Sequence, residues 1–289
     1  MKVFITGAEG MLGKDVVSTL HSGGHEVFPS DLRMEGPGKL DLTDEKAVQR
    51  AINRAQPEIV FHLGAFTDVD KSESQPLDAF RVNALGTQNL ALACLELGIP
   101  LLYVSTDYVF DGKKDCPYLE YDQTAPLGIY GQSKRAGEIH IQQLLSRFFI
   151  VRTSWLYGAQ GKNFVDTIAK AGREKKELTV VNDQFGSPTY TIDLAKALLD
   201  IAKSGRYGIY HATGGGETTW FHFAAKILEL ANIPTPVLPI STEDLNRPAP
   251  RPRYSVMRNL SLELAGLPPL PAWEDALSRY LKGVVVQQP

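Results

Sequence analysis

Cysteine is scarce in this sequence, neither sign of charge dominates it, and long hydrophobic runs are missing. Its 289 residues include two cysteines, Cys94 and Cys116, too few for a disulfide framework or a cysteine-based metal centre. The formal net charge is −3 and the basic residues form no stripe, which argues against nucleic acid as a partner. No stretch reaches the roughly 20 apolar residues that span a membrane, and the apolar N-terminal run is too short for a signal peptide. We therefore expect a protein of the reducing cytoplasm that binds neither membrane nor nucleic acid.

A glycine-rich turn near the N-terminus is the first feature that indicates a ligand. Residues 3–6 form a short apolar run typical of a buried strand, and a helical pattern begins at Lys14. Between them lie Gly7, Gly10 and Gly13, spaced so that the backbone can turn tightly and approach a pyrophosphate at the helix N-terminus. This spacing is looser than G-x-G-x-x-G, but the strand before it and the helix after it are what a dinucleotide-binding turn requires.

Strand and helix patterns alternate along the chain, which predicts a parallel sheet covered by helices on both faces. The expected strands are residues 3–6, 26–30, 59–63, 101–105, 148–153, 179–181 and 208–211. The expected helices are residues 14–22, 45–54, 76–97, 134–146, 164–173, 192–203 and 220–230. We predict an α/β fold, a Rossmann-type doubly wound parallel sheet with a smaller, mostly C-terminal substrate-binding domain. The dinucleotide-binding domain would take residues 1–155 plus about 184–214, and the substrate domain about 156–183 plus 215–289.

Two charged residues at the end of the second expected strand bear on the choice of cofactor. Asp31 is placed to accept hydrogen bonds from the adenosine ribose hydroxyls, which favours NADH. Arg33 could instead meet the 2′-phosphate of NADPH, or it could lie in a solvated turn. The preference between NADH and NADPH stays open.

Tyr130 and Lys134 are spaced to share one face of a helix. A nearby ammonium favours the phenolate and lowers the pKa of the tyrosine, so that the phenol can exchange protons at neutral pH. Alone, this spacing is an ordinary surface feature. Ser105 and Thr106 end the fourth expected strand, where either hydroxyl could hold a substrate carbonyl while Tyr130 delivers a proton, or Thr106 and Asp107 could cap a loop.

Three other residues lie near the same expected edge of the sheet. Gly64 is among the small residues after the third strand, which leave room for a dinucleotide. His62 in that position is more often a hydrogen-bonded structural residue than a catalyst. Asn83, inside a helical pattern, could order the loop under the Tyr–Lys pair or bind a local backbone group.

Three segments together resemble the extended short-chain dehydrogenase/reductases. They are Thr6-Gly7-Ala8-x-Gly10-x-x-Gly13, Ser105-Thr106-Asp107-Tyr108-Val109-Phe110-Asp111-Gly112 and Tyr130-Gly131-x-Ser133-Lys134. Four more segments resemble, more narrowly, the dTDP-4-dehydrorhamnose reductase family, so the likeness runs from end to end. They are Val151-Arg152-Thr153-Ser154-Trp155-Leu156-Tyr157-Gly158, Asn163-Phe164-Val165, Asp183-Gln184-Phe185-Gly186-Ser187-Pro188-Thr189 and Arg251-Pro252-x-Tyr254-Ser255.

The resemblance implies NADPH- or NADH-dependent reduction of the C4 ketone of dTDP-4-dehydro-L-rhamnose to dTDP-L-rhamnose, a sugar donor for cell-surface polysaccharide. It implies that Tyr130 protonates the alkoxide, that Lys134 holds the nicotinamide ribose and that Thr106 fixes the carbonyl. The expected substrate-binding residues are Thr106, Asp107, Tyr130, Trp155 and Arg251. The expected cofactor-binding residues are Gly7, Gly10, Met11, Leu12, Gly13, Asp31, Arg33, Asp41, Leu42, Gly64, Ala65, Thr67, Asn83, Tyr130 and Lys134.

Other readings stay open within this family likeness. A related nucleotide-sugar dehydratase commonly has Asp-Glu after the threonine, whereas Asp107 is followed by Tyr108, which counts against dehydration. Reduction of another 4-keto nucleotide sugar, or a regulatory subunit like that of methionine adenosyltransferase, are the alternatives. Some relatives dimerise around a metal. Asp15 matches one such ligand but Ile192 stands where another carboxylate is expected, so we predict no metal, and a monomer or homodimer.

Overall fold

A six-stranded parallel sheet organises the computed structural model, which describes residues 1–285. Its strand order is β10-β5-β4-β3-β1-β2, and every neighbouring pair is parallel. The strands are β1 (Lys2–Thr6), β2 (Glu26–Ser30), β3 (Ile59–His62), β4 (Leu101–Thr106), β5 (Phe148–Thr153) and β10 (Gly208–His211). The order reverses beside β1, because β2 lies on one side of it and β3 and β4 on the other. The predicted Rossmann-type sheet is thereby confirmed.

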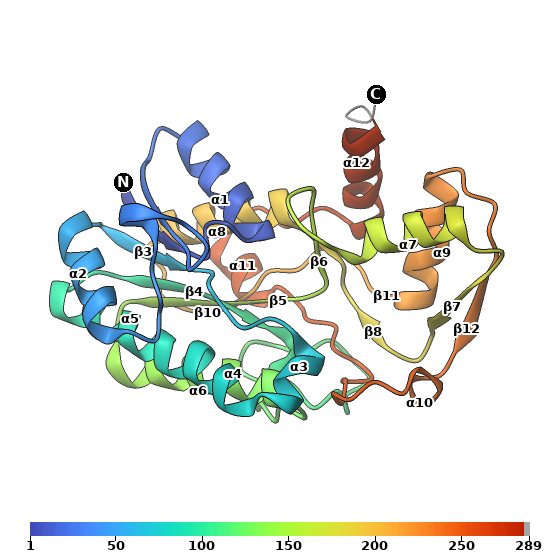
Figure 1. Cartoon of the computed structure of the whole chain (residues 1–289), viewed down its shortest axis with the longest axis horizontal. Helices are drawn as coiled ribbons and strands as arrows, with labels where there is room; N and C mark the ends of the chain where they lie inside the picture. Colours follow the sequence, from blue (N-terminus) through green and yellow to red (C-terminus); the bar gives the residue numbers. More distant parts are fainter. Residues whose placement is uncertain (286–289) are drawn as a thin grey trace.

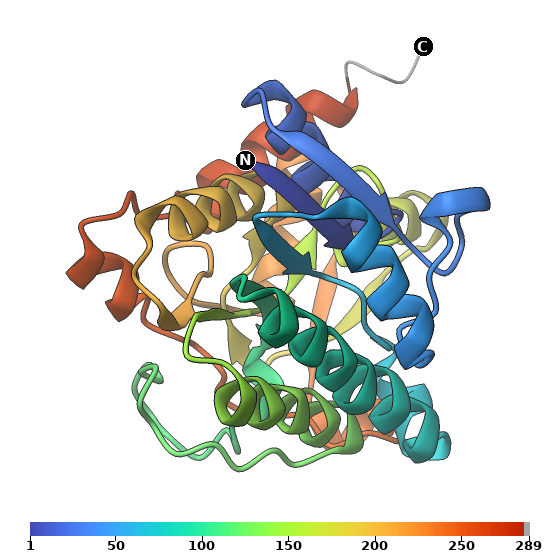
Figure 2. The ribbon, with the colours of Figure 1, turned by 90° about the vertical axis from the view of Figure 1, so that its left-hand side faces the viewer.

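Two layers of helices cover the sheet, and the alternation of side chains along β1 shows how (Figures 1 and 2). Val3 and Ile5 pack with the layer of α1 and α8, whereas Phe4 packs with the opposite layer of α2, α5 and α6. The first layer comprises α1 (Met11–Ser22) and α8 (Thr191–Ser204), with α11 (Leu260–Ala265) against β10. The second comprises α2 (Glu45–Ala55), α5 (Gly86–Leu97) and α6 (Ile129–Leu144).

Several element boundaries differ from those expected. The helix expected over residues 76–97 is α4 (Pro76–Phe80), a π-helical turn (Arg81–Leu85) and α5 in succession. Helix α6 begins at Ile129 rather than at residue 134, which places the Tyr–Lys pair in its first two turns. The expected strand 179–181 is real, as β7 (Leu178–Val181), but it pairs with β12 (Val237–Ile240) outside the central sheet. Its side chains pack against α9 (Trp220–Leu230), so burial in this contact, and not membership of the main sheet, explains their apolar pattern.

A second group of elements packs around its own apolar cluster beside the sheet, at the right of Figure 1. Tyr157, Phe223 and Leu277 are fully buried in it. Its helices are α7 (Phe164–Glu174), α9 (Trp220–Leu230) and α12 (Trp273–Val285). Small pairings join it to the rest: β6 (Leu156–Tyr157) with β9 (Thr189–Tyr190), and β8 (Phe185–Gly186) with β11 (Thr218–Thr219). The shorter helical elements are 3₁₀ turns Gly36–Gly38 and Asp107–Val109, α3 (Val69–Ser74) and α10 (Thr242–Leu245).

Within residues 1–285, every helix is too short or too polar to cross a lipid bilayer.

Candidate active site

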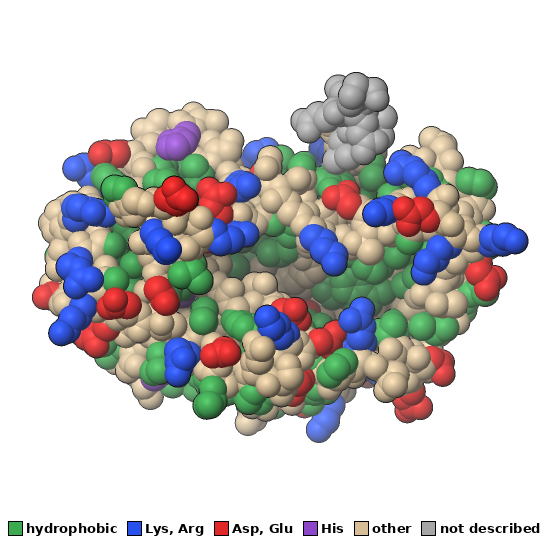
Figure 3. Space-filling model, viewed as in Figure 1, with side chains coloured by type: hydrophobic (Ala, Val, Ile, Leu, Met, Phe, Trp, Pro, Cys, Tyr) green, Lys and Arg blue, Asp and Glu red, His purple; other side chains and the backbone are tan. Residues whose placement is uncertain are grey.

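The carboxyl ends of the strands open into a cleft of about 860 Å³. Figure 3 shows the molecule hollowed near the middle of this face, between the sheet and the group of α7 and α9. Most of the expected site residues line the cleft, although they come from segments far apart in the chain. They are Gly7, Gly10, Met11, Leu12, Gly13, Asp31, Arg33, Asp41, Leu42, Gly64, Ala65, Thr67, Thr106, Asp107, Tyr130, Lys134 and Trp155. Asn83 and Arg251 do not line it.

The glycine turn after β1 leaves a cradle that side chains would fill. Gly7 has φ +73°, and a Cβ there would lie 2.5 Å from the backbone nitrogen of Gly64. A Cβ at Gly13 would collide with the carbonyl oxygen of Gly7. Gly10 caps α1 without a side-chain hydrogen bond, so the first N–H groups of that helix have no side-chain acceptor there. The turn therefore fits the pyrophosphate of a dinucleotide, whose charge the helix N-terminus favours.

Asp31 directly follows β2 and lines the cleft, and its carboxylate already accepts several hydrogen bonds. Its donors are the backbone N–H groups of Glu9 (3.1 Å) and Arg33 (2.9 Å) and the guanidinium of Arg33 (3.1 Å). Burial raises the pKa of Asp31, but these hydrogen bonds outweigh it and lower that pKa overall. Arg33 is held beside the carboxylate while its side chain stays 65% exposed, so both groups expected to choose the cofactor lie at one end of the cleft.

Asn83 supports the site from beneath. Its side chain accepts from Phe66 N (2.8 Å) and donates to Phe66 O and to Ser133 Oγ (both 3.0 Å). The residue thus ties the loop after β3 to α6 one position before Lys134, which agrees with the first of its two expected roles. The π-helical turn that contains it is a distortion frequent at functional sites. Asn83 was expected to bind the cofactor, but its side chain is buried behind the loop and does not line the cleft, so its effect on the cofactor site is indirect.

His62 is fully buried and contacts two hydroxyls, Thr6 Oγ1 (2.8 Å) and Thr87 Oγ1 (2.9 Å). Burial lowers its pKa well below the ordinary value, so the ring is neutral. The expectation of a structural histidine agrees with this geometry.

Ser105 and Thr106 both line the cleft, but their hydroxyls have different hydrogen-bond partners. Ser105 Oγ donates to Glu138 Oε1 (2.6 Å), behind the strand. Thr106 Oγ1 donates to Asp107 Oδ1 (3.0 Å), and its oxygen accepts from Tyr108 N (3.2 Å). From the sequence alone, either hydroxyl could hold the substrate carbonyl. The bond from Ser105 to the buried Glu138 favours Thr106 for that role.

The prediction that Lys134 lowers the pKa of Tyr130 is wrong for this structure. Burial raises the pKa of Tyr130, and the carboxylate of Asp107 raises it further. Lys134 Nζ donates to the carbonyl oxygen of Val104 (2.8 Å) and lies 4.1 Å from the ring centroid of Tyr103. Burial lowers the pKa of Lys134 to about 7, which halves its average charge at neutral pH. The phenol consequently stays protonated, which is the form that can donate a proton.

Trp155 lies at the far end of the cleft in a strained backbone conformation. Its φ is +48°, a region that costs a non-glycine residue roughly 1–3 kcal/mol. The indole stacks on Trp220 with centroids 3.5 Å apart and planes 7° from parallel. Gly186 lies against the indole, and a Cβ there would collide with it. The stack and the missing side chain together hold an aromatic face at the cleft wall.

Arg251 lies outside the cleft, where Asp70 of α3 holds it. Its Nη2 is 3.0 and 3.1 Å from the two carboxylate oxygens, and Arg247 also contacts Asp70, at 3.0 Å. These bonds hold the loop that contains Arg247 and Arg251 against the start of α3. The attraction of Asp70 for the guanidinium explains why Arg251 is not among the cleft residues.

Lys162 and Gln160 line the cleft but were not expected to. They follow β6 in a loop whose Gly161 lies close to Met11, so the loop lies beside the glycine turn after β1. The short run Gly158-Ala159-Gln160-Gly161-Lys162, with two glycines before a lysine, was the available signal. Phe66 and Tyr108 also line the cleft and were missed, because nothing in the pattern of single apolar residues marks a lining role.

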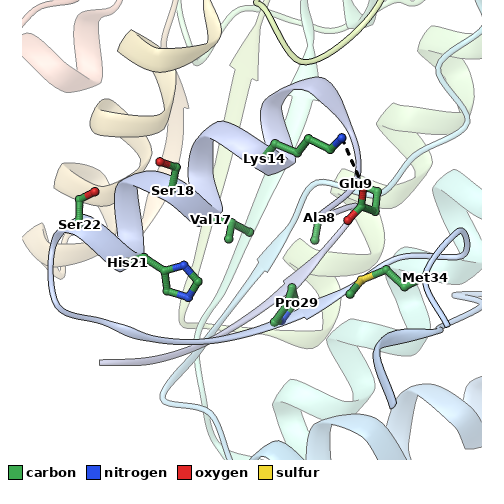
Figure 4. A pocket seen from close by; sticks show the side chains of 9 residues that line it. All are labelled: Ala8, Glu9, Lys14, Val17, Ser18, His21, Ser22, Pro29 and Met34. Atoms are coloured by element: carbon green, nitrogen blue, oxygen red, sulfur yellow. Dashed lines mark ion pairs between the residues drawn. The ribbon is translucent and has the colours of Figure 1, made fainter. Parts of the chain in front are cut away.

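A second, shallower hollow of about 410 Å³ lies between α1 and β2 (Figure 4). Lys14 pairs with Glu9 at 3.5 Å on its rim, and His21 and Met34 also border it. Glu9, whose backbone N–H donates to Asp31, lines both hollows, so the second one lies beside the Asp31 end of the cleft. Within residues 1–285 no three His, Cys, Asp or Glu side chains gather as a metal site.

Comparison with known proteins identifies the family. The RmlD substrate binding domain family matches residues 1–286. A dTDP-4-dehydrorhamnose reductase of Streptomyces griseus is 42% identical over 95% of this chain and 91% of its own length. The chain belongs to the dTDP-4-dehydrorhamnose reductase family. A spore coat polysaccharide biosynthesis protein of Bacillus subtilis is 40% identical over 97% of both chains. The dTDP-4-dehydrorhamnose reductase of Bacillus anthracis, solved in complex with NADP, is 41% identical, covers 98% of this chain and 100% of its own, and has a TM-score of 0.93.

Proposed function

We propose that this chain reduces the C4 ketone of dTDP-4-dehydro-L-rhamnose to the alcohol of dTDP-L-rhamnose, with NADPH or NADH. The observation that supports it most is the position of Tyr130, Thr106 and Lys134 in the lining of the same cleft as the glycine cradle. Reduction of a ketone requires one hydride and one proton. A positioned phenol supplies the proton, and general acid catalysis of this kind contributes about 10²–10⁴ in rate.

Each residue has one task in this reaction. The bound dinucleotide supplies the hydride to C4 of the sugar. Tyr130 gives its hydroxyl proton to the oxygen that becomes the alcohol, and Lys134 orders the ribose of the dinucleotide. Thr106 orients the phenol, and Gly7 and Gly13 let the backbone approach the pyrophosphate.

We infer that the sugar nucleotide lies between Trp155 and the loop with Lys162. The Trp155–Trp220 stack offers a flat apolar face, and the Lys162 ammonium offers a partner for the diphosphate. Residues of about 156–183 and 215–289 would form most of this substrate domain, which the separate apolar cluster around Phe223 supports. We place the protein in the cytoplasm as a monomer or homodimer, in keeping with free Cys94 and Cys116.

The direct test is oxidation of NADPH and NADH, followed at 340 nm, with enzymatically generated dTDP-4-dehydro-L-rhamnose. We expect turnover that depends on the sugar nucleotide and forms dTDP-L-rhamnose stoichiometrically. Tight cofactor binding without turnover would contradict the proposal and would favour a different 4-keto sugar or a regulatory subunit.

Replacing Arg33 with Ala should raise the KM for NADPH about tenfold or more and change that for NADH less than about twofold. A hydrogen bond to a charged group contributes about 1.5–3 kcal/mol, which corresponds to that range. The guanidinium is exposed enough to turn from Asp31 to a 2′-phosphate, and its loss frees Asp31 for the ribose hydroxyls. Steady-state kinetics with both cofactors measure this, with Arg54→Ala on the exposed end of α2 as the control. Equal effects on the two cofactors would exclude a 2′-phosphate contact.

A further inference from the structure

Ser255, near the C-terminal end of the chain, is linked to Thr106 through the carboxylate of Asp107. Its Oγ donates to Asp107 Oδ2 at 2.6 Å, while Thr106 donates to Asp107 Oδ1 at 3.0 Å. Ser255, Asp107 and Thr106 are 2%, 2% and 6% exposed, so water does not compete for these bonds. One carboxylate therefore links a C-terminal serine to a residue of the catalytic group.

The backbone around Ser255 is pinned on both sides. Ser255 N donates to Phe185 O (2.9 Å), and Tyr254 N donates to Gly112 O (3.3 Å). Tyr118 N donates to Val256 O at 2.8 Å. The hydroxyl is thus held in place by a segment that borders the substrate side of the molecule, and its direction is fixed before any ligand arrives.

A single hydroxyl proton limits what Thr106 can do. The Thr106 hydroxyl can hydrogen-bond either Asp107 or Tyr130, and donation to Tyr130 would stabilise the phenolate. A carboxylate attracts that proton more strongly than a neutral phenol does. Thr106 then turns an oxygen lone pair, and not a proton, toward Tyr130.

We propose that Ser255 is a positioning residue: by donating to Asp107 it keeps the Thr106 proton on the Asp107 carboxylate, so that the Thr106 oxygen holds one orientation toward Tyr130 during reduction. Loss of the Ser255 hydroxyl removes one of the donors that favour ionised Asp107. A protonated Asp107 is a weaker acceptor for Thr106, whose hydroxyl is then no longer held in that orientation. The proposal rests on the reductase function above.

The ionisation of Asp107 makes this measurable as a pH profile. Burial raises the pKa of Asp107 to about 6, and Ser255 and Thr106 oppose that rise. Without Ser255 that pKa rises further, so the acid limb of kcat moves to higher pH. The other titratable groups nearby are Tyr108 in the same turn, Tyr130 and Lys134 on α6, and the Arg251–Asp70 pair beside Tyr108. The pKa of Lys134, about 7, lies close to that of Asp107. A variant that lacks the Asp107 carboxyl is therefore needed to tell the two titrations apart.

Ser255→Ala should lower kcat about tenfold at pH 6 and about threefold at pH 7, and should match the wild type within about twofold at pH 9. The KM for the sugar nucleotide should not change. Ser255→Thr, which retains a hydroxyl, should restore the wild-type profile. In the Asp107→Asn background, Ser255→Ala should have no further effect at any pH.

Ser261→Ala is the matched control, because Ser261 Oγ donates to the carbonyl oxygen of Ile209 (2.8 Å) away from the cleft. It should lower the unfolding temperature as Ser255→Ala does but leave the pH profile unmoved. A Ser255→Ala effect that is equal at all pH values, or that persists with Asp107→Asn, would overturn the proposal. Absence of turnover in the wild type would instead reject the reductase function and is recognised separately.

Discussion

Replacement of Tyr130 by Phe should lower kcat about a thousandfold, in the middle of the range for a lost general acid. The ring remains and keeps its edge contact with Tyr108, at 5.7 Å between centroids, so the cleft should keep its shape. The Kd for NADPH should change less than about threefold, because the glycine cradle and Asp31 are untouched. Stopped-flow or steady-state absorbance at 340 nm gives kcat, and quenching of tryptophan fluorescence gives the Kd.

Tyr121→Phe provides the control for this change. Tyr121 is 75% exposed and lies outside the cleft, so the same loss of a hydroxyl should leave kcat and Kd unaltered. Full turnover by Tyr130→Phe would show that another group delivers the proton. Loss of cofactor binding together with turnover would show that the phenol has a binding role.

The direction of the Tyr130 pKa differs from the sequence prediction, but it leaves the phenol in the form that can donate a proton. A lowered pKa would make the phenol a stronger acid and would also leave part of it ionised. Burial and the Asp107 carboxylate both favour the protonated form, and Lys134 is turned to a backbone carbonyl. The pattern Tyr-x-x-x-Lys gives the face of the helix but not where the ammonium points, since that depends on Val104 of a neighbouring strand.

Local patterns were sufficient for most of the cofactor side of the cleft. Gly7, Asp31 and Gly64 each follow a strand and Thr106 ends one, and the carboxyl ends of parallel strands meet at one edge of a sheet. Four local observations therefore converge on one site without knowledge of any distant contact. The same reasoning found α1, α2 and α4 to α9 but missed α3, α10, α11, α12 and the π-helical turn, in which Asn83 binds a distant loop.

Long-range pairs were beyond local patterns. Asp70 and Arg251 are 181 residues apart, and Asp107 and Ser255 are 148 apart. Each partner alone looks like an ordinary polar residue of a loop or helix. Only the packing of the C-terminal segment against the sheet brings them together, and this packing decides that Arg251 faces Asp70 and not the cleft.

A buried ion pair behind the site was also missed, and it gives the largest expected effect on stability. Arg152 and Glu138 are 2% and 0% exposed in their side chains and share two hydrogen bonds, of 3.0 and 2.8 Å. Replacement of Arg152 by Met should lower the free energy of unfolding by about 3–5 kcal/mol, because Glu138 loses its fully buried cationic partner and keeps only the more exposed Arg135, at 3.1 Å. Urea or thermal unfolding followed by circular dichroism measures the loss. Because Glu138 also accepts from Ser105, which precedes Thr106, its displacement should lower kcat as well.

The pH dependence of this loss follows from Glu138. Burial raises the pKa of Glu138, but the charge and hydrogen bonds of Arg152 outweigh it, and the pKa is lowered overall. A depressed carboxylate pKa contributes stability above the unfolded value, near 4.5, and this contribution is lost as pH falls through the folded value. The difference between the wild type and Arg152→Met should therefore be full at pH 7 and shrink below about pH 4.5.

Two variants distinguish the buried pair from ion pairs in general. Arg258→Met removes an equally two-pronged pair with Glu263, but both side chains are about half exposed, so the unfolding midpoint should hardly move. The double variant Glu138→Leu with Arg152→Met removes both buried charges and should recover part of the stability lost by Arg152→Met alone. If the double variant were less stable than the single one, packing of the arginine, and not the carboxylate left without Arg152, would account for the loss.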